Sequence, residues 1–370
     1  SMHQTVIDRR TFLWGLAAFL GLPATARGSE GAMRETVIAS TVRRHDGSFA
    51  AVLYDLDAGL LNSVALPARG HDVAVNPSRR EVVAFARRPG TFAVAFSRDR
   101  DRAPAAFSTP PGRHFYGHGA FSRDGRILYT TENDYATGAG CIGVWDAAAG
   151  YRRIGEIPSH GIGPHDINLL GDGRTLVIAN GGIATHPDHG REPLNLASMR
   201  PSLAYVDRLT GDLVVRQELP AAMHQSSIRH LDVGTGDTVV FGCQFKGAKT
   251  GWADLIGFHR RGETIELLSG GPTVDRALRH YVSSIAVDRS GEVAGVTSSR
   301  GNGIVLVDIE SRTLIGVRSF ADVSGIAVGA EAGRLVITSG SGDLGAVTPA
   351  GEVASSIRLP WSWDNHAVGI

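Results

Sequence analysis

The chain has 370 residues, 42% of them apolar and 20% charged, and its 37 lysines and arginines balance its 37 aspartates and glutamates. This length and composition are typical of a globular protein with a large core, and the even charge argues against nucleic acid as the main partner, since nucleic-acid-binding domains usually carry a basic excess. Two cysteines are too few for a disulfide framework, whereas 14 histidines are a slight excess whose positions along the chain are informative.

The first thirty residues are typical of an export signal. Asp8-Arg-Arg-Thr-Phe-Leu13 resembles a twin-arginine (Tat) signal, an apolar run from Trp14 to Leu22 follows it, and Ala24-Thr-Ala26 fits a cleavage site. A chance arginine pair in an ordinary Sec signal is the alternative interpretation. The apolar run is too short for a stable anchor, so we expect residues 1–30 to be removed and the protein to reside in the periplasm with no stable membrane span. Ser1-Met2 is interpreted as a cloning scar.

Residues 31–370 contain a repeat of four short strands. Each unit opens with an alternating strand, continues with a Val-rich strand, and closes with strands that often end in Val-Asp and Leu-Pro, as at Asp207 and Pro220. Four strands in a period of about 40–50 residues are the signature of a β-propeller blade. The opening strands start 41 to 64 residues apart, at His71, His118, His165, Arg229, Ser283, Ser324 and His366.

The two ends of this region complement each other. The chain ends on an opening strand, residues 366–370, while residues 36–41, 49–55 and 60–67 form three strands with no opening strand before them. Joined, they make one complete blade and leave no free sheet edge. We therefore predict an all-β fold: a single seven-bladed β-propeller of four-stranded antiparallel blades, spanning residues 31–370 and closed by pairing of the C-terminal strand with the N-terminal blade.

Histidine occupies the first position of four of the seven opening strands. The opening strand of each propeller blade lines the central channel, so these side chains are expected to meet near the channel axis. Neutral imidazole is a common ligand of iron, copper, zinc and nickel, and we predict a transition-metal site that holds iron or copper. Asp72 and Asp166 follow two of the histidines and are candidate carboxylate partners, although ideal strand alternation would point them away. The predicted ligands are His71, His118, His165 and His366.

Other polar residues are candidates for accessory roles near this site. Arg229 takes the histidine position in the fourth opening strand and indicates an anion or a carboxylate beside the metal, for which Glu132 and Asp134 are candidates. Arg87-Arg88 could attract an anionic ligand, but solvent exposure is the simpler interpretation. The accessory histidines are His114, His160, His224 and His280 on loops above the channel, and His186 and His189 in an insertion at residues 181–201 that could bind metal or cover the channel.

Separate motifs across the chain resemble those of one family. They include Tyr116-Gly-His-Gly-Ala-Phe-Ser122, Thr131-Glu-Asn-Asp134, Gly163-Pro-His-Asp166 and Thr185-His-Pro-Asp188. On these residues the mature chain resembles the uncharacterised domain-of-unknown-function family numbered 1513, a group of Tat-exported bacterial propellers. The resemblance implies a periplasmic protein associated with imelysin-like proteins and a di-haem oxidoreductase in iron uptake, and it supplies no catalytic residues.

Two functional hypotheses remain at this point. The leading one is a periplasmic propeller that binds iron or copper through the channel histidines and supports metal acquisition or redox handling of the metal. An enzymatic role stays open, because a free coordination position could serve a metal-dependent oxidoreductase. The alternative is a non-catalytic interaction scaffold of an iron-uptake system, in which the histidines are incidental to the docking of partner proteins.

Overall fold

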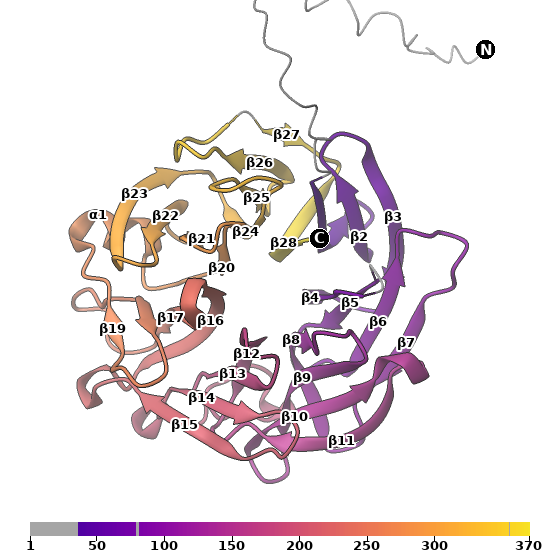
Figure 1. Cartoon of the computed structure of the whole chain (residues 1–370), viewed down its shortest axis with the longest axis horizontal. Helices are drawn as coiled ribbons and strands as arrows, with labels where there is room; N and C mark the ends of the chain where they lie inside the picture. The colour runs from indigo at the N-terminus through magenta and orange to yellow at the C-terminus, as the bar shows by residue number, and fades with distance from the viewer. Residues whose placement is uncertain (1–35, 79–80, 355) are drawn as a thin grey trace, which may run out of the picture. The chain divides into compact units, whose positions relative to one another are not determined.

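Short segments rich in Val, Ile, Ala and Phe form strands throughout the described residues, which are 36–78, 81–354 and 356–370 of this computed structural model. The strands make seven four-stranded antiparallel sheets, arranged as blades around a central channel (Figure 1). The predicted seven-bladed all-β propeller is therefore confirmed. The expected export signal, residues 1–30, lies outside the described residues.

Six blades follow one another in chain order, each running from an inner strand that lines the channel to an outer strand. The first three comprise β4 (Gly70–Asn76), β5 (Glu81–Ala86), β6 (Phe92–Ser97) and β7 (Ala105–Ser108); β8 (Arg113–Phe121), β9 (Ile127–Asp134), β10 (Ala139–Asp146) and β11 (Arg152–Pro158); and β12 (Pro164–Leu169), β13 (Thr175–Asn180), β14 (Ser202–Asp207) and β15 (Leu213–Glu218). The next three comprise β16 (Ser226–Gly234), β17 (Thr238–Phe245), β18 (Ile256–His259) and β19 (Glu266–Leu267); β20 (Ser284–Val287), β21 (Val293–Ser298), β22 (Gly303–Asp308) and β23 (Thr313–Ser319); and β24 (Val323–Val328), β25 (Leu335–Ser339), β26 (Asp343–Val347) and β27 (Ile357–Arg358).

The seventh blade is built from both ends of the described chain. Its inner strand β28 (Trp361–Gly369) pairs antiparallel with β1 (Val37–Arg44), and β2 (Phe49–Asp55) and β3 (Gly59–Leu66) complete the sheet. The ring is thus closed by backbone hydrogen bonds between the two ends, as predicted. Closure removes the free sheet edges that an open ring would expose.

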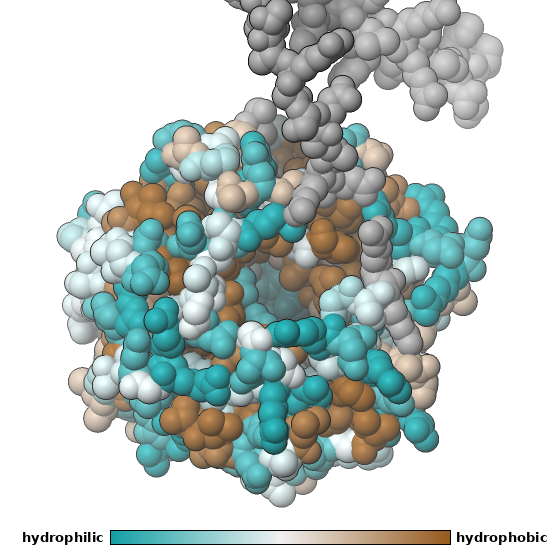
Figure 2. Space-filling view, in the orientation of Figure 1, coloured by the Kyte–Doolittle hydropathy of each residue, from teal (hydrophilic) through white to brown (hydrophobic). Residues whose placement is uncertain are grey.

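Aromatic and aliphatic side chains fill the spaces between adjacent blades. Between the first two blades, Phe85 and Phe115 pack with their ring centroids 5.7 Å apart, and Trp145 joins the same cluster. The one α-helix of the described residues, α1 (Gly271–Leu278), buries Val274 and Leu278 beside the fifth blade. No helix in the described part of the chain has the length and apolar character needed to cross a membrane. Figure 2 shows that the centre of the propeller is hollowed, with hydrophilic residues inside the hollow and hydrophobic ones on part of its rim.

Several inner strands contain a β-bulge near their beginning. The pairing of β4 with β5 shifts by one residue between Gly70 and Val73, and that of β12 with β13 shifts between Pro164 and Asp166. A bulge adds an unpaired residue to one strand and changes the direction in which the neighbouring side chains point. These bulges decide which side chains face the channel.

Candidate metal centre

Five buried histidines meet in the central channel, each from a different inner strand. His118 on β8 lies at the middle of the group, with its ring centroid 4.9 Å from those of His71, His165 and His366 and 5.4 Å from that of His230. All five side chains are at most 7% exposed. We call them the histidine cluster. The structure therefore brings together the four predicted ligands and adds a fifth histidine.

His230 is the member that sequence reasoning missed. A bulge in β16 between Ile228 and His230 inserts one residue relative to β17. Arg229 therefore borders a small cavity beside His165, while His230 lines the larger cavity on the other side of the cluster. The adjacent pair Arg229-His230 was the signal in the sequence. If the alignment of this opening strand is shifted by one residue, His230 takes the position that the other four histidines occupy.

The same kind of bulge explains the position of two carboxylates. Strict alternation would turn Asp72 away from the side on which His71 lies, but the shifts in β4 and β12 bring Asp72 and Asp166 to the channel as well. Nδ1 of His118 lies 2.8 Å from Oδ2 of Asp72 and 3.3 Å from Oδ1 of Asp166. A carboxylate on one imidazole nitrogen fixes the ring and leaves the other nitrogen, here Nε2, as the ligand atom.

The ring nitrogens are close enough to share metal ions. Two groups of three histidines, His71 with His118 and His366, and His118 with His165 and His230, each have their ligand atoms within 4.8 Å of one another. A third such group combines His118 with Asp72 and Asp166. His118 belongs to all three groups, so it is the shared element of the candidate centre.

Each histidine of the cluster has a buried ring nitrogen with no hydrogen-bond partner among the described residues. Buried polar atoms in folded proteins are almost always hydrogen-bonded, and an orphaned one costs about 1–3 kcal/mol. His230 illustrates the deficit, since its Nδ1 is 4.0 Å from the nearer Asp166 oxygen, beyond hydrogen-bond range. Leaving aside Nδ1 of His118, which faces the two carboxylates, these atoms are Nδ1 of His71, His165 and His230, and Nε2 of His118 and His366.

Burial and mutual repulsion hold most of the cluster in the neutral form. Burial lowers the pKa of His366 to about 4, and Ser284 Oγ lies 3.1 Å from its Nδ1, which leaves Nε2 free. Burial, followed by the nearby charges of other cluster members, also lowers the pKa values of His71, His165 and His230 well below the ordinary range. A neutral imidazole has the lone pair that metal coordination requires.

His118 is the exception in its protonation. Burial opposes its charged form, but Asp166 and Asp72 outweigh burial and raise the pKa of His118 to about 10. In return, although burial works in the other direction, the charge of His118 lowers the pKa of Asp72. Without a metal, His118 is therefore an imidazolium at neutral pH, and a metal bound at Nε2 would replace one proton.

The two ends of the channel differ in charge. Because the inner strands run in the same direction, residues that follow the histidines lie toward one end and residues that precede them lie toward the other. The following residues enclose a cavity of about 410 Å³ lined by Asp72, Asp166 and Asp232. Burial raises the pKa of Asp232 to about 6. We call this the acidic end, and its carboxylates would attract a cation toward the histidine cluster.

The expected carboxylate partners of Arg229 have other partners. Glu132 is fully buried within its blade and forms a two-point ion pair with Arg153, at 2.8 and 3.0 Å. Asp134 pairs with Arg113 at 2.9 Å. Both lie on β9, and the pairs hold them in that blade's network. The expectation that they neutralise Arg229 is therefore wrong.

The accessory histidines also make contacts outside the cluster. His114 has its Nδ1 2.9 Å from the oxygen of Phe115 and its Nε2 3.1 Å from Asn133, which fixes the ring inside the second blade. Tyr135 stands between His114 and the insertion, with His186 in edge contact at 5.3 Å. The other four have separate settings: His160 contacts the oxygen of Gly211, His224 that of Ala221, His280 stacks on Trp252, and His189 is exposed beside His186.

Comparison with known proteins gives a family for this propeller. The family model described as protein of unknown function (DUF1513) matches residues 64–370. The chain belongs to this family. All five residues of the histidine cluster lie within the part of the chain that matches DUF1513.

The propeller is also similar to a solved structure. Hydrazine synthase from Kuenenia stuttgartiensis has a TM-score of 0.61 and 13% sequence identity, over 92% of this chain and 99% of that chain. A likeness at this identity shows the fold alone. No curated protein matches the sequence of this DUF1513 chain.

Proposed function

We propose that this DUF1513 protein binds a transition metal, iron or copper, in the histidine cluster and supports metal acquisition or redox handling of the metal in the periplasm. One observation carries the proposal: five buried imidazoles from five strands converge, and each leaves a ring nitrogen without a hydrogen-bond partner in the described structure. A metal ion is the ligand that satisfies several such nitrogens at once.

The donor set supports a transition metal, a class that includes the proposed iron and copper. Imidazole suits copper, iron, zinc and nickel, whereas magnesium and calcium prefer sites built from oxygen ligands. The carboxylates of Asp72 and Asp166, held against Nδ1 of His118, add negative charge beside the cluster, which favours the binding of a cation. The periplasmic setting rests on the signal pattern of residues 1–30, and the proposed partners, imelysin-like and di-haem proteins, rest on the family resemblance.

Metal analysis of the protein purified without a polyhistidine tag tests the proposal. We expect about one equivalent of iron or copper per chain, and less than about 0.2 equivalents in a His118→Ala/His165→Ala variant that has lost the shared ligand. His45, exposed in the turn after β1, provides the matched control, because His45→Ala removes a histidine without touching the cluster.

The opposite outcome favours the scaffold hypothesis. Wild-type protein with less than about 0.2 equivalents, and with no tight rebinding of added iron or copper, contradicts the metal proposal. A scaffold with incidental histidines would also tolerate the double substitution without any change in metal content or growth on scarce iron.

A further inference from the structure

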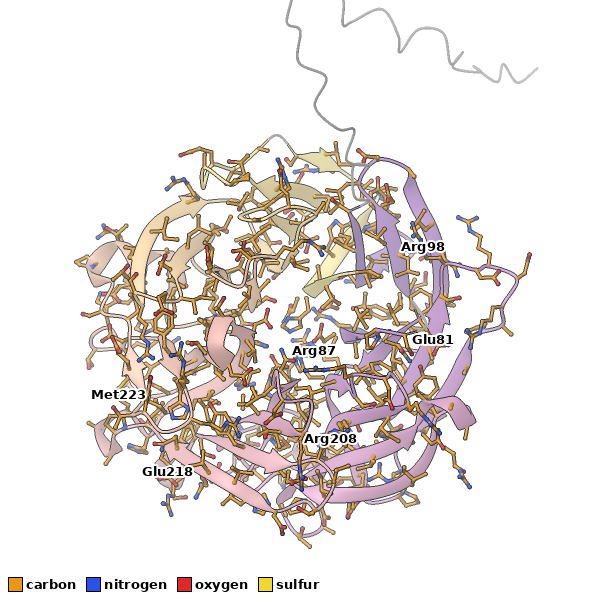
Figure 3. The ribbon with its side chains drawn as sticks, viewed as in Figure 1. Glu81, Arg87, Arg98, Arg208, Glu218 and Met223 are labelled. Atoms are coloured by element: carbon orange, nitrogen blue, oxygen red, sulfur yellow. The ribbon has the colours of Figure 1, made fainter. Side chains whose placement is uncertain are left out.

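Positively charged side chains gather at the channel end opposite the acidic one. They come from separate parts of the chain: Arg87 and Arg88 follow β5, Arg191 lies in the insertion, Arg229 is on β16 and Lys246 follows β17. Their charges lie close enough together to affect one another, since Arg88, Arg229 and Arg191 all act on Lys246. We call these five residues the basic mouth. Figure 3 shows Arg87 beside the central opening.

None of these five cations has an ion-pair partner within the described ranges of the chain. Nε and Nη1 of Arg87 are buried and have no hydrogen-bond partner among the residues that the structure describes. Asp364 is near enough to influence Arg87, but both of its carboxylate oxygens are already bonded to Arg69, at 2.7 and 3.0 Å. Arg229 is only 7% exposed, and among the described residues its side chain makes one hydrogen bond, from Nε to the hydroxyl of Ser227. Buried charges are normally paired, so the buried Arg229 lacks a counter-charge, and the half-buried Arg87, Arg88 and Lys246 around it supply none.

Repulsion among these positive charges lowers the pKa values of several members of the basic mouth. Burial, followed by the charge of Arg229, lowers the pKa of Arg88 to about 10. Burial, followed by the charge of Arg88, lowers the pKa of Arg191 to about 10 as well. Burial, with Arg229 and Arg88 next, lowers the pKa of Lys246 to about 8. An anion among these side chains would remove the repulsion that causes part of these shifts.

A small cavity connects the basic mouth to the metal centre. It has a volume of about 10 Å³, and its lining includes Arg88, Arg229, the hydroxyl-bearing Tyr116 and Thr185, and His165 of the histidine cluster. This is room for one water-sized group. A ligand oxygen here would contact guanidinium groups on one side and the metal-binding imidazole on the other.

We propose that the basic mouth binds a small oxyanion, with carboxylate or phosphate groups, whose oxygen enters the cavity between Arg88 and Arg229. Guanidinium groups match both kinds of oxyanion through paired N–H donors. The two channel ends then have distinct tasks: the acidic end admits a cation and the basic mouth holds an anion above the same histidines. The five residues of the basic mouth are distinct from the five of the histidine cluster, so anion binding there is a property separate from the proposed metal binding.

Calorimetric titration with citrate and with inorganic phosphate tests the proposal, on the protein as purified and after removal of metal by a chelator. We expect one site per chain for at least one probe, with affinity that weakens as salt is added. Arg88→Gln and Arg229→Gln should each reduce the affinity about ten-fold or more, which corresponds to about 1.4 kcal/mol. Which probe binds distinguishes a carboxylate ligand from a phosphate ligand.

Arg152→Gln is the matched control, since Arg152 is exposed on the outer strand β11 and should leave the affinity unchanged. If the substitutions at Arg88 or Arg229 prevent folding, Lys246→Gln replaces them as the test variant, because Lys246 is half-buried in the same group of cations. Absence of binding of both probes below about 10 mM overturns the proposal. Binding confined to metal-loaded protein and unchanged by Arg88→Gln also overturns it, because the metal would then hold the anion. Failure on metal-free protein leaves the proposed metal binding intact.

Discussion

His118 is the residue on which the candidate centre depends most. It belongs to all three groups of potential ligands, and Asp72 and Asp166 orient it through Nδ1. No other histidine of the cluster has a carboxylate so close to a ring nitrogen among the described residues. Nδ1 of His230, for example, lies 4.0 Å from Oδ2 of Asp166. The two aspartates would therefore act on a bound metal through His118, as positioning residues.

Removing these carboxylates tests that role. We expect Asp72→Asn/Asp166→Asn to weaken metal binding about 10–100-fold, because His118 loses the acceptors that orient its ring. The double variant should also release less than one proton on metal binding at pH 8, whereas the parent releases about one from His118. Competition with a coloured chelator and calorimetry in buffers of different ionisation enthalpy measure the two effects. Asp46→Asn in an exposed turn is the control, and equal affinities in all three proteins would exclude the positioning role.

Gly117 shows how closely the backbone approaches the cluster. Its φ is +105°, and a Cβ placed there would lie 2.6 Å from Cδ2 and 2.9 Å from Cβ of His71. Glycine is needed at this position both for its backbone conformation and for the lack of a side chain. The position lies within the irregular part of β8, between Phe115 and Gly119, where the pairing with β9 shifts.

We expect Gly117→Ala to lower the free energy of unfolding by about 3 kcal/mol, from backbone strain and from the contact with His71 together. Gly112→Ala is the matched control in the turn just before β8, because Gly112 has φ +82° and open space where a Cβ would lie. This control should lower the free energy of unfolding by about 1 kcal/mol, from backbone strain alone. Denaturant unfolding of both variants gives the comparison. Equal losses would mean that His71 does not oppose a side chain at residue 117.

At the scale of elements, bulged inner strands turn a repeated fold into a specific site. A regular strand directs adjacent side chains to opposite faces, so it could not present both His71 and Asp72 to the channel. The bulges in β4 and β12 remove that restriction. The bulge in β16 places His230, and not Arg229, in the histidine cluster. Sheet irregularities often accompany functional sites for this reason.

The strand β28 has two tasks, since it closes the ring and supplies His366. Trp363 anchors it: the indole is 3% exposed, contacts Tyr54 edge-on at 6.3 Å and donates from Nε1 to the oxygen of Gly342 at 3.3 Å. The anchor therefore touches both the first strands of the chain and the neighbouring blade.

We predict that Trp363→Ala destabilises the propeller by about 3–5 kcal/mol, as is usual for loss of a buried tryptophan. It should also increase proteolysis at the ring junction. Trp252→Ala is the control, because Trp252 is 54% exposed and packs mainly on His280. Thermal unfolding and limited proteolysis report the difference. An effect of Trp363→Ala no greater than that of the control would show that the closure is not a major source of stability.

At the scale of the whole molecule, the fold was predictable from sequence and the details of the site were not. Seven repeats of local strand patterns, and the complementary ends at residues 36–67 and 366–370, determine the propeller. The bulge that places His230 depends on packing between neighbouring inner strands, which a single strand pattern does not reveal. The sequence also does not reveal the surroundings of Arg88. Its pattern favours a solvated loop, whereas the structure places Arg88 half-buried among cations from distant segments.

The unusual protonation of the cluster predicts a pH dependence of stability. Four of its histidines have folded-state pKa values below the ordinary 6.5, with that of His366 at about 4, so the unfolded chain binds more protons as the pH falls below 6.5. Their contribution to stability is therefore present above pH 6.5 and lost below it. His118 has the opposite sign: its contribution is present below pH 6.5 and lost as the pH rises through about 10.

We expect the metal-free protein to be most stable near neutral pH and its Tm to fall by about 5 °C or more between pH 7 and pH 5. Scanning calorimetry of chelator-treated protein measures this. A His165→Ala/His230→Ala variant should show a shallower decline, because two of the groups responsible are gone. A Tm that is flat over this interval in the parent protein would contradict the assignment of neutral buried imidazoles.

Anomalous X-ray diffraction shows most directly whether the histidine cluster holds a transition metal. Crystals of the untagged protein, measured on both sides of the iron and copper absorption edges, show where the metal lies and which element it is. We predict an anomalous peak about 2.0–2.2 Å from Nε2 of His118 and from nitrogens of at least two other histidines of the cluster. A crystal of metal-replete protein with its anomalous peak elsewhere, and with none among these five histidines, would contradict metal binding by the cluster.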